Sequence, residues 1–227
     1  KAVFSIAKKM GVKGEVFEKL EKRLSEFSVN ESQSQDPDPS SEQLQPIISL
    51  YTQGRLQNAL SETTQMLKRF PYSVVLYNIA GASNAGLKQF DEAIACYQQA
   101  LKIKPEYADT YNNMGIALDD KGDSEAAIKS FKKALKIKPD YAEACNNMGN
   151  TLTSKGDSEA AIKSFKKALK IKPDYAEAYY NMGVTLMNKG DLKAAIDSYQ
   201  QALKIKPDYA EAYSNMGNAQ KNKGDSE

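Results

Sequence analysis

The sequence predicts an all-α solenoid built from stacked pairs of helices. The first observation is a period of 34 residues, which three residue types keep in a single register. Its members are Pro71, Pro105, Pro139, Pro173 and Pro207; Ala59, Ala93, Ala127, Ala161 and Ala195; and Gly81, Gly115, Gly149, Gly183 and Gly217. The second observation is that each period holds two amphipathic segments. A pair this small cannot bury its own apolar side, so neighbouring pairs must stack.

The period at residues 142–175 illustrates the two helices. We expect Asp140 and Glu143 to form a capping box at the start of the first helix. Gly156 is expected to end this helix, and Asp157 to cap the second. Apolar and small residues follow helical spacing in both segments, at Cys145, Met148, Gly149, Leu152, Ala161, Ile162, Phe165, Ala168, Leu169 and Ile171. We expect the small side chains among them to let the helices approach closely.

These residues resemble a known family signature. Gly149, Leu152, Gly156, Ala161, Phe165, Ala168 and Pro173 are similar to the signature positions of the tetratricopeptide repeat (TPR). The resemblance implies that helices A and B of each repeat pack antiparallel, in a right-handed superhelical solenoid whose concave face is lined by helices A. The regular repeats are 74–107, 108–141, 142–175 and 176–209, followed by a truncated repeat at 210–227.

The beginning of the chain departs from this pattern. Residues 40–73 form a degenerate first repeat of the array 40–227, in which Pro46 replaces a core residue and Thr63 stands where Phe or Tyr is usual. Residues 29–41 are polar and contain prolines, which predicts a flexible linker. Residues 1–28 carry an amphipathic helical pattern of unknown role, at Val16, Phe17, Leu20, Leu24 and Phe27. A docking helix, a cap for the solenoid and the tail of another domain are all open. Because the sequence lacks an initial methionine and stops inside a repeat, we expect a fragment.

Composition argues against several classes of function. The 227 residues include no histidine, which excludes histidine-based catalysis and histidine metal ligands, and the formal net charge is +2. Cys96 and Cys145 have no zinc-binding spacing, and free buried thiols in a reducing, cytoplasmic environment are expected. No segment approaches the roughly 18 apolar residues of a membrane span. We therefore expect no catalytic residue, cofactor, metal, nucleic acid or membrane partner.

The exposed positions of helices A are the candidate binding surface, because residues spaced by four, three and four lie on one helical stripe. The candidates are polar or acidic: Asn113, Asn147, Asn181, Asn215, Asn150, Asn218, Asp109, Glu143, Glu177, Asp120 and Asn188. The first four form a column with the period of the repeat. A carboxamide both donates and accepts, so such a column can pair with the main chain of an extended peptide. Polar tolerance at an exposed position is an equally weighted explanation.

Family resemblance adds two expectations about the ligand. The column resembles the asparagine ladder that holds substrate polypeptides in the TPR domain of O-GlcNAc transferases. The stripe has no cation before its truncated end, so it is unsuited to the carboxylate clamp of chaperone adaptors. A neutral or basic polypeptide is the expected partner. Lysines recur on helices B, and we interpret them as a solvated outer face.

Three functions are compatible with these features. The first is a protein-interaction scaffold that binds an extended or helical segment in the concave groove. The second is the substrate-targeting arm of a larger transferase, glycosyltransferase or sulfotransferase-like, with its catalytic domain outside residues 1–227. The third is self-association of arrays through their exposed ends.

Overall fold

The computed structural model describes residues 38–224, which form eleven helices and contain no strand. The predicted all-α helical-repeat fold is confirmed. The helical segment predicted at 1–28 and the linker up to residue 37 lie outside the described residues, as do residues 225–227.

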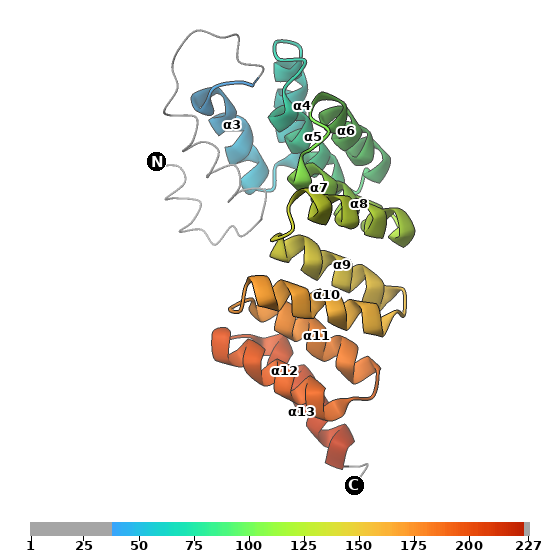
Figure 1. Cartoon of the computed structure of the whole chain (residues 1–227). Coiled ribbons are helices and arrows are strands. Elements are labelled where there is room, and N and C mark those ends of the chain that lie inside the picture. The colour runs from blue at the N-terminus through green and yellow to red at the C-terminus, as the bar shows by residue number, and fades with distance from the viewer. Residues whose placement is uncertain (1–37, 225–227) are drawn as a thin grey trace. The chain divides into compact units, whose positions relative to one another are not determined.

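The helices belong to two compact units, and the boundary falls between residues 105 and 106. Unit 1 contains α3 (Ser41–Thr52), α4 (Leu56–Leu67), α5 (Val74–Gly86) and α6 (Phe90–Ile103). Unit 2 contains α7 (Ala108–Asp120), α8 (Ser124–Ile137), α9 (Ala142–Ser154), α10 (Ser158–Ile171), α11 (Ala176–Asn188), α12 (Leu192–Ile205) and α13 (Ala210–Gly224). Within unit 2 the helices follow one another as a stack of pairs (Figure 1).

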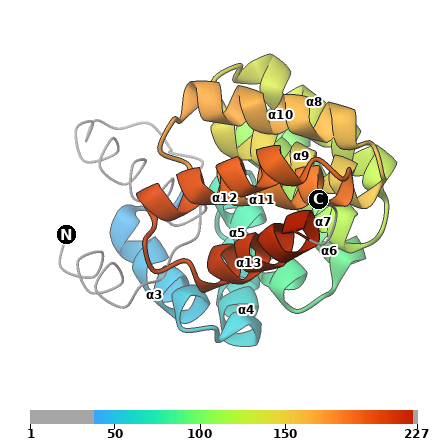
Figure 2. The same ribbon diagram turned by 90° about the horizontal axis from the view of Figure 1, so that it is seen from below.

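Unit 2 has two layers of helices. Helices A (α7, α9, α11 and α13) contact each other from one repeat to the next, and each helix B (α8, α10 and α12) contacts the helix A before and after it. Figure 2 views this unit from the end formed by α13, with α8 and α10 along one edge. Because successive helices A lie closer together than successive helices B, helices A form the inner side of the stack.

The start of each helix B agrees with the predicted caps. The carboxylate of Asp157 accepts a hydrogen bond from the backbone nitrogen of Ala160 at 3.1 Å, and Asp123 and Asp191 cap α8 and α12 in the same way. Gly156 ends the preceding helix with φ +85°, a conformation that favours glycine. The aspartate that follows the turn glycine thus begins the next helix directly after the last one has ended.

The capping box predicted at Asp140 and Glu143 is wrong. Helix α9 begins at Ala142, and its N-cap is Tyr141, which makes no side-chain capping hydrogen bond. Asp140 lies one residue too early to reach the first free backbone amides. Tyr141 is fully buried, and its ring packs with Ala108, Ala134 and Ala144 from three helices. Packing of the tyrosine between repeats therefore decides where the helix begins.

Helices A and B of one repeat pack through a glycine and an aromatic ring. A Cβ atom placed on Gly149 would lie 2.5 Å from Cε1 of Phe165, which is fully buried. The same juxtaposition joins Gly81 to Tyr97, Gly115 to Phe131, and Gly183 to Tyr199. The helices can approach this closely only because the helix A residue has no side chain. This contact is the repeated centre of the core.

The first repeat solves the same packing problem with different residues. At the positions of the glycine and the ring it carries Ile47 and Thr63, and both are buried. Thr63 satisfies its hydroxyl by donating to the carbonyl oxygen of Ala59 at 2.6 Å. In this repeat the helix A residue is thus larger than the glycine of the other repeats, and the helix B residue is smaller than their aromatic ring. Pro46 does not replace a core residue, contrary to the prediction, because its side chain is exposed in α3.

The two thiols are free, as predicted. Cys145 is fully buried in α9, whereas Cys96 is partly buried in α6. Burial raises the pKa of both thiols, so the reactive thiolate is disfavoured at neutral pH.

Burial of a tyrosine ring makes the stability of unit 2 sensitive to alkaline pH. Burial, with a smaller contribution from Tyr180, raises the pKa of Tyr199 to about 12 from its ordinary value of 10.0. Because the folded-state pKa is the higher one, the stabilisation is complete below about pH 10 and is lost as the pH rises toward about 12. We expect Tyr199→Phe to reduce this alkaline loss in denaturation curves recorded at about pH 9, 10.5 and 12.

The chain supplies the controls for this experiment. Phe131 and Phe165 occupy the equivalent position in other repeats, so phenylalanine is compatible with the packing there. Tyr72 is 69% exposed, so Tyr72→Phe is the control for removal of a tyrosine hydroxyl outside the core. An alkaline loss that is identical in Tyr199→Phe and the wild type would contradict the assignment.

Candidate polypeptide-binding surface

All the residues predicted to bind a ligand lie on helices A of unit 2. Exposed side chains are Asp120, Glu177, Asn188 and Asn218, and partly exposed ones are Asp109, Asn113, Glu143, Asn147, Asn150, Asn181 and Asn215. They therefore share one layer of helices, and each has some surface in contact with solvent. We name this set, with its supporting helices, the A surface.

The asparagine column is tied together by hydrogen bonds between repeats. The Nδ2 atom of Asn147 donates to Oδ1 of Asn112 at 3.1 Å, and Nδ2 of Asn181 donates to Oδ1 of Asn146 at 3.1 Å. In the next repeat, Nδ2 of Asn215 donates to the hydroxyl of Tyr180 at 3.0 Å. Each bond joins residues 35 positions apart, one repeat plus one residue. The column therefore has a structural role within unit 2.

These hydrogen bonds also orient the amides. A carboxamide has two N–H donors and an oxygen with two lone pairs, and one donor of each amide is used between repeats. Within residues 38–224, the side chains of Asn147, Asn181 and Asn215 make no other hydrogen bond. The second N–H and the oxygen thus remain for another partner, on an amide whose plane is already held.

The acceptors Asn112, Asn146 and Tyr180 were not among the predicted site residues. They occupy the position just before each column asparagine, and Asn146 is buried. The sequence did carry a signal for these acceptors, since three consecutive repeats have a hydrogen-bonding side chain at the position just before the column asparagine. The period alone could not show that the residue pairs across repeats, because this depends on how far one helix A is offset from the next.

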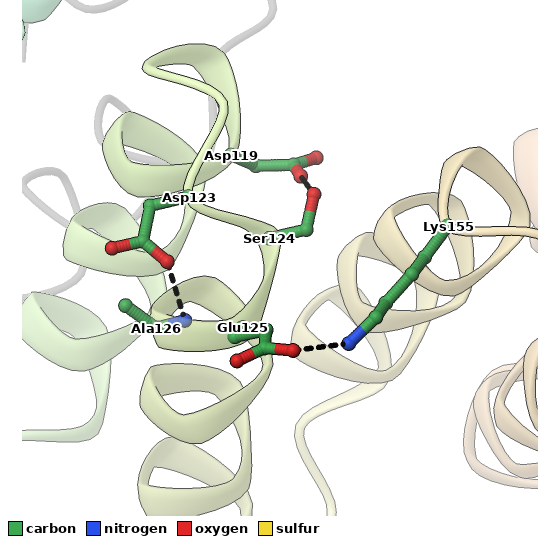
Figure 3. Close-up of polar contacts among 6 residues, drawn as sticks. All are labelled: Asp119, Asp123, Ser124, Glu125, Ala126 and Lys155. Carbon is green, nitrogen blue, oxygen red and sulfur yellow. Dashed lines mark hydrogen bonds and ion pairs between the residues drawn. The ribbon is translucent and has the colours of Figure 1, made fainter.

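The first helix of unit 2 carries two neighbouring carboxylates at its C-terminal end. Oδ1 of Asp119 accepts a hydrogen bond from the hydroxyl of Ser124 at 3.1 Å (Figure 3). Partial burial, and secondly the charge of Asp119, raise the pKa of Asp120. Both effects disfavour the charged form of Asp120. A cation close to this end of the A surface would offset them.

Ion pairs link the edge of the A surface to the preceding repeat. Nζ of Lys155 lies 2.9 Å from Oε1 of Glu125, and Nζ of Lys189 lies 3.2 Å from Oε1 of Glu159. In Figure 3, Lys155 reaches from the end of α9 to Glu125 in the first turn of α8. The pair lowers the pKa of Glu125, chiefly through the hydrogen bond from Lys155. Because both lysines are engaged, they add little positive charge to the A surface.

Metal-ligand groups and membrane-spanning helices are both absent from the described part of the chain. Residues 38–224 contain no group of three or more His, Cys, Asp or Glu side chains placed to hold a metal ion. In the same range, every helix is too short or too polar to cross a lipid bilayer.

The fold and this surface define a helical-repeat protein. A family model described as TPR repeat matches residues 87–122, 149–190 and 185–224, and one described as tetratricopeptide repeat matches 108–141. Together they match more than half of the chain, which therefore belongs to the tetratricopeptide-repeat family. This fold supports a protein-interaction scaffold. No curated protein matches the sequence.

Solved structures show the same fold at low sequence identity. A structure of MamA has a TM-score of 0.63 and 24% identity, covering 72% of this chain and 95% of that chain. TTC0263, a thermophilic TPR protein in Thermus thermophilus, has a TM-score of 0.65 and 23% identity, covering 78% of this chain and 97% of that chain. YrrB, described as a TPR protein with an unusual peptide-binding site, has a TM-score of 0.60 and 22% identity. The match covers 86% of this chain and 96% of that chain.

Proposed function

We propose that unit 2 is a non-catalytic scaffold that binds an extended polypeptide along its A surface. The observation that carries the proposal is the column Asn147, Asn181 and Asn215, whose amides are held by hydrogen bonds to the preceding repeat. Fixed amides lose little conformational entropy when they bind, which favours affinity. Their free donor and acceptor match the alternating carbonyl and amide groups of a peptide main chain. Asn113 extends the same column to α7.

Charge on the A surface selects the class of polypeptide. Helices α7, α9 and α11 contain five acidic residues and no basic one: Asp109, Asp119, Asp120, Glu143 and Glu177. A segment with lysine or arginine is therefore favoured over an acidic one. Asn150, Asn188 and Asn218 add neutral hydrogen-bonding groups next to the column. The description of YrrB as peptide-binding is in keeping with a peptide ligand.

The transferase-arm alternative receives no specific support from unit 2. Residues 38–224 contain only repeat helices, and the likeness to O-GlcNAc transferase repeats stays a prediction from sequence.

The proposal is tested by removing the column amides. We expect the triple variant Asn147→Ala, Asn181→Ala and Asn215→Ala to bind fluorescent peptides of about 12 residues at least about tenfold more weakly, since each lost hydrogen bond is worth roughly 0.5–1.5 kcal/mol. Fluorescence anisotropy would compare lysine-containing, neutral and glutamate-containing peptides. Lysine-containing peptides should bind best to the wild type and glutamate-containing peptides least.

A matched variant separates binding from stability. Asn112→Ala with Asn146→Ala breaks two of the same inter-repeat hydrogen bonds but keeps the column. We expect this variant to be destabilised and to lose some affinity, but clearly less than the triple variant, because the column amides are still present although two of them are no longer held. Equal weakening in the two variants, or binding that is the same in the triple variant and the wild type, would refute the column as the binding site.

A further inference from the structure

Two helices of unit 2 that contribute no residue to the A surface carry an array of exposed lysines. Helices α8 and α10 have the same sequence, SEAAIKSFKKALKI, and all their lysines are exposed. The lysines within these helices are Lys129, Lys132, Lys133, Lys136, Lys163, Lys166, Lys167 and Lys170. We name them the B array. Figure 2 shows the two helices along the same edge of unit 2.

The B array is neutralised only in small part by its own helices, because α8 and α10 each have one glutamate and four lysines, although the charge of Lys129 does help to lower the pKa of Glu125. The acidic residues of α8 and α10 are Glu125 and Glu159, and each forms an ion pair with Lys155 or Lys189 of the following repeat. Lys133 lies over the ring of Tyr111 at 5.3 Å, which leaves its charge in place. Lysines three or four residues apart on one helix repel each other. The array therefore costs unit 2 some stability.

Packing of the repeat does not require these lysines. Helix α12 has the same place in its repeat, and it carries Gln200 and Gln201 where α8 has Lys132 and Lys133. It also has Asp197 at the position that lysine occupies in α8 and α10. Yet α12 has the same length as α10 and buries alanines and an aromatic ring at the equivalent positions. The core packing of the repeat therefore does not account for the array.

The opposite charge lies on the A surface of the same unit. Glu143, Glu177 and Glu211 recur every 34 residues in the first turn of successive helices A, and Asp109 has the same place in α7. The last two glutamates lie near Tyr209, whose pKa is raised to about 12 by burial and then by charges that include both. Unit 2 thus has a basic layer, formed by the lysines of α8 and α10, and an acidic layer, formed by the carboxylates of helices A. The residues of both layers recur every 34 positions.

We propose that the B array binds the A surface of a second copy of this chain. The two charged sets share the repeat period, so one correct contact brings the contacts of the next repeat into register. The long, flexible stems of lysine absorb the small difference in spacing between the inner and outer layers. Because the surfaces differ, the contact is heterologous, and each added copy exposes both surfaces again. The proposal goes beyond peptide binding and predicts that the two processes compete for the A surface.

Sedimentation velocity of the intact chain tests the proposal. We expect the average mass to rise with protein concentration at about 0.01 M salt, where charges act over about 30 Å, and to return to the monomer value at about 1 M salt, where they act over about 3 Å. The B variant changes Lys132, Lys133, Lys166 and Lys167 to Gln, as in α12. It should weaken self-association at least about tenfold, because several ion pairs are lost together.

A charge exchange identifies the two surfaces. One variant changes the same four lysines to Glu, and a second changes Glu143, Glu177 and Glu211 to Lys. Each variant alone should associate much less than the wild type at about 0.01 M salt. In the first variant, four glutamates cancel the charge of the four remaining lysines of the B array. In the second, three lysines cancel the charge of Asp109, Asp119 and Asp120 on the A surface. An equimolar mixture should associate again, because the first variant keeps the acidic A surface and the second keeps the basic B array. Circular dichroism before mixing shows whether both variants are folded.

Other results would overturn the proposal. A wild-type chain that stays monomeric at low salt would do so, as would a mixture of folded variants that does not associate. Salt-dependent capture of polyglutamate or of anionic phosphatidylserine vesicles by the B array, without self-association, would assign the array to a different partner. The Gln variant retains the asparagine column, so peptide binding to it tests the proposed function separately.

Discussion

Replacing Phe165 with alanine is expected to lower the free energy of unfolding by about 3–5 kcal/mol, the largest effect of any single change considered for this chain. The ring is fully buried between α9 and α10, and it fills the space left by Gly149. Ile128, Met148 and Met182 from neighbouring helices, and Ala160 from α10 itself, pack against its cluster. Backbone atoms of α9 cannot move into the cavity without breaking their own helical hydrogen bonds. The loss therefore includes both the transfer of apolar surface and the cavity.

Urea denaturation of the intact chain, followed by circular dichroism, measures this effect. A stack of repeats can unfold in parts, so the curve should be fitted with a nearest-neighbour description as well as with two states. Lys166→Ala, on the exposed side of the same helix, is the control and should change stability by about 0.5 kcal/mol or less. A loss below about 1 kcal/mol for Phe165→Ala would contradict the packing described for this repeat.

Gly149→Ala is expected to destabilise the chain although alanine favours helices. The added Cβ would lie 2.5 Å from Cε1 and 2.7 Å from Cζ of Phe165, so the ring or the helix must shift. Overpacking of this kind costs about 1–3 kcal/mol. The gain from replacing a helical glycine with alanine is about 0.5–1 kcal/mol and offsets only part of this cost. We expect a net loss of about 1–2 kcal/mol in the same denaturation experiment.

Gly217 provides a control in the same sequence context. It is the equivalent glycine of α13, and a Cβ atom there would have no neighbour within 4 Å. Gly217→Ala should therefore stabilise α13 by about 0.5–1 kcal/mol, through helix propensity alone. Opposite signs at the two glycines would identify the ring contact as the cause. If both changes stabilise, the aromatic ring does not constrain the glycine.

Much of the fold is visible in the sequence because it depends on local and periodic features. The aspartate caps, the glycines that end helices A and the 34-residue step each act within a few residues or between identical neighbours. Phe165 could be placed in the core for the same reason, since its helical spacing aligns it with Ala161 and Ala168. The start of α9 was misplaced because Tyr141 is held by packing with three helices, and a local capping pattern cannot reveal that.

The candidate site was located from sequence, but its internal connections were not. The stripe of polar residues on helices A followed from helical spacing, and the structure places all of its members on those helices. Missing from that stripe were Asn146 and Tyr180, which accept hydrogen bonds from the column of the next repeat. The pairing depends on the offset between adjacent helices, and this offset results from how whole repeats pack.

The first repeat also differs between what one position indicates in the sequence and what the packed structure shows. Thr63 departs from the aromatic residue of other repeats, and by itself the substitution indicates degeneration. In the structure, Ile47 replaces the glycine on helix A, and both side chains are buried. The residue that is smaller on helix B is therefore matched by a larger one on helix A, which no single position could indicate.

The sequence by itself determined the class of fold, the register of the repeats and the polar character of the A surface, because periodicity and capping are properties of short segments. Only the tertiary structure decided how core volume is shared between paired helices and which amides join adjacent repeats. Those features arise from contacts between residues some 16 to 35 positions apart, whose geometry exists only once the helices have packed.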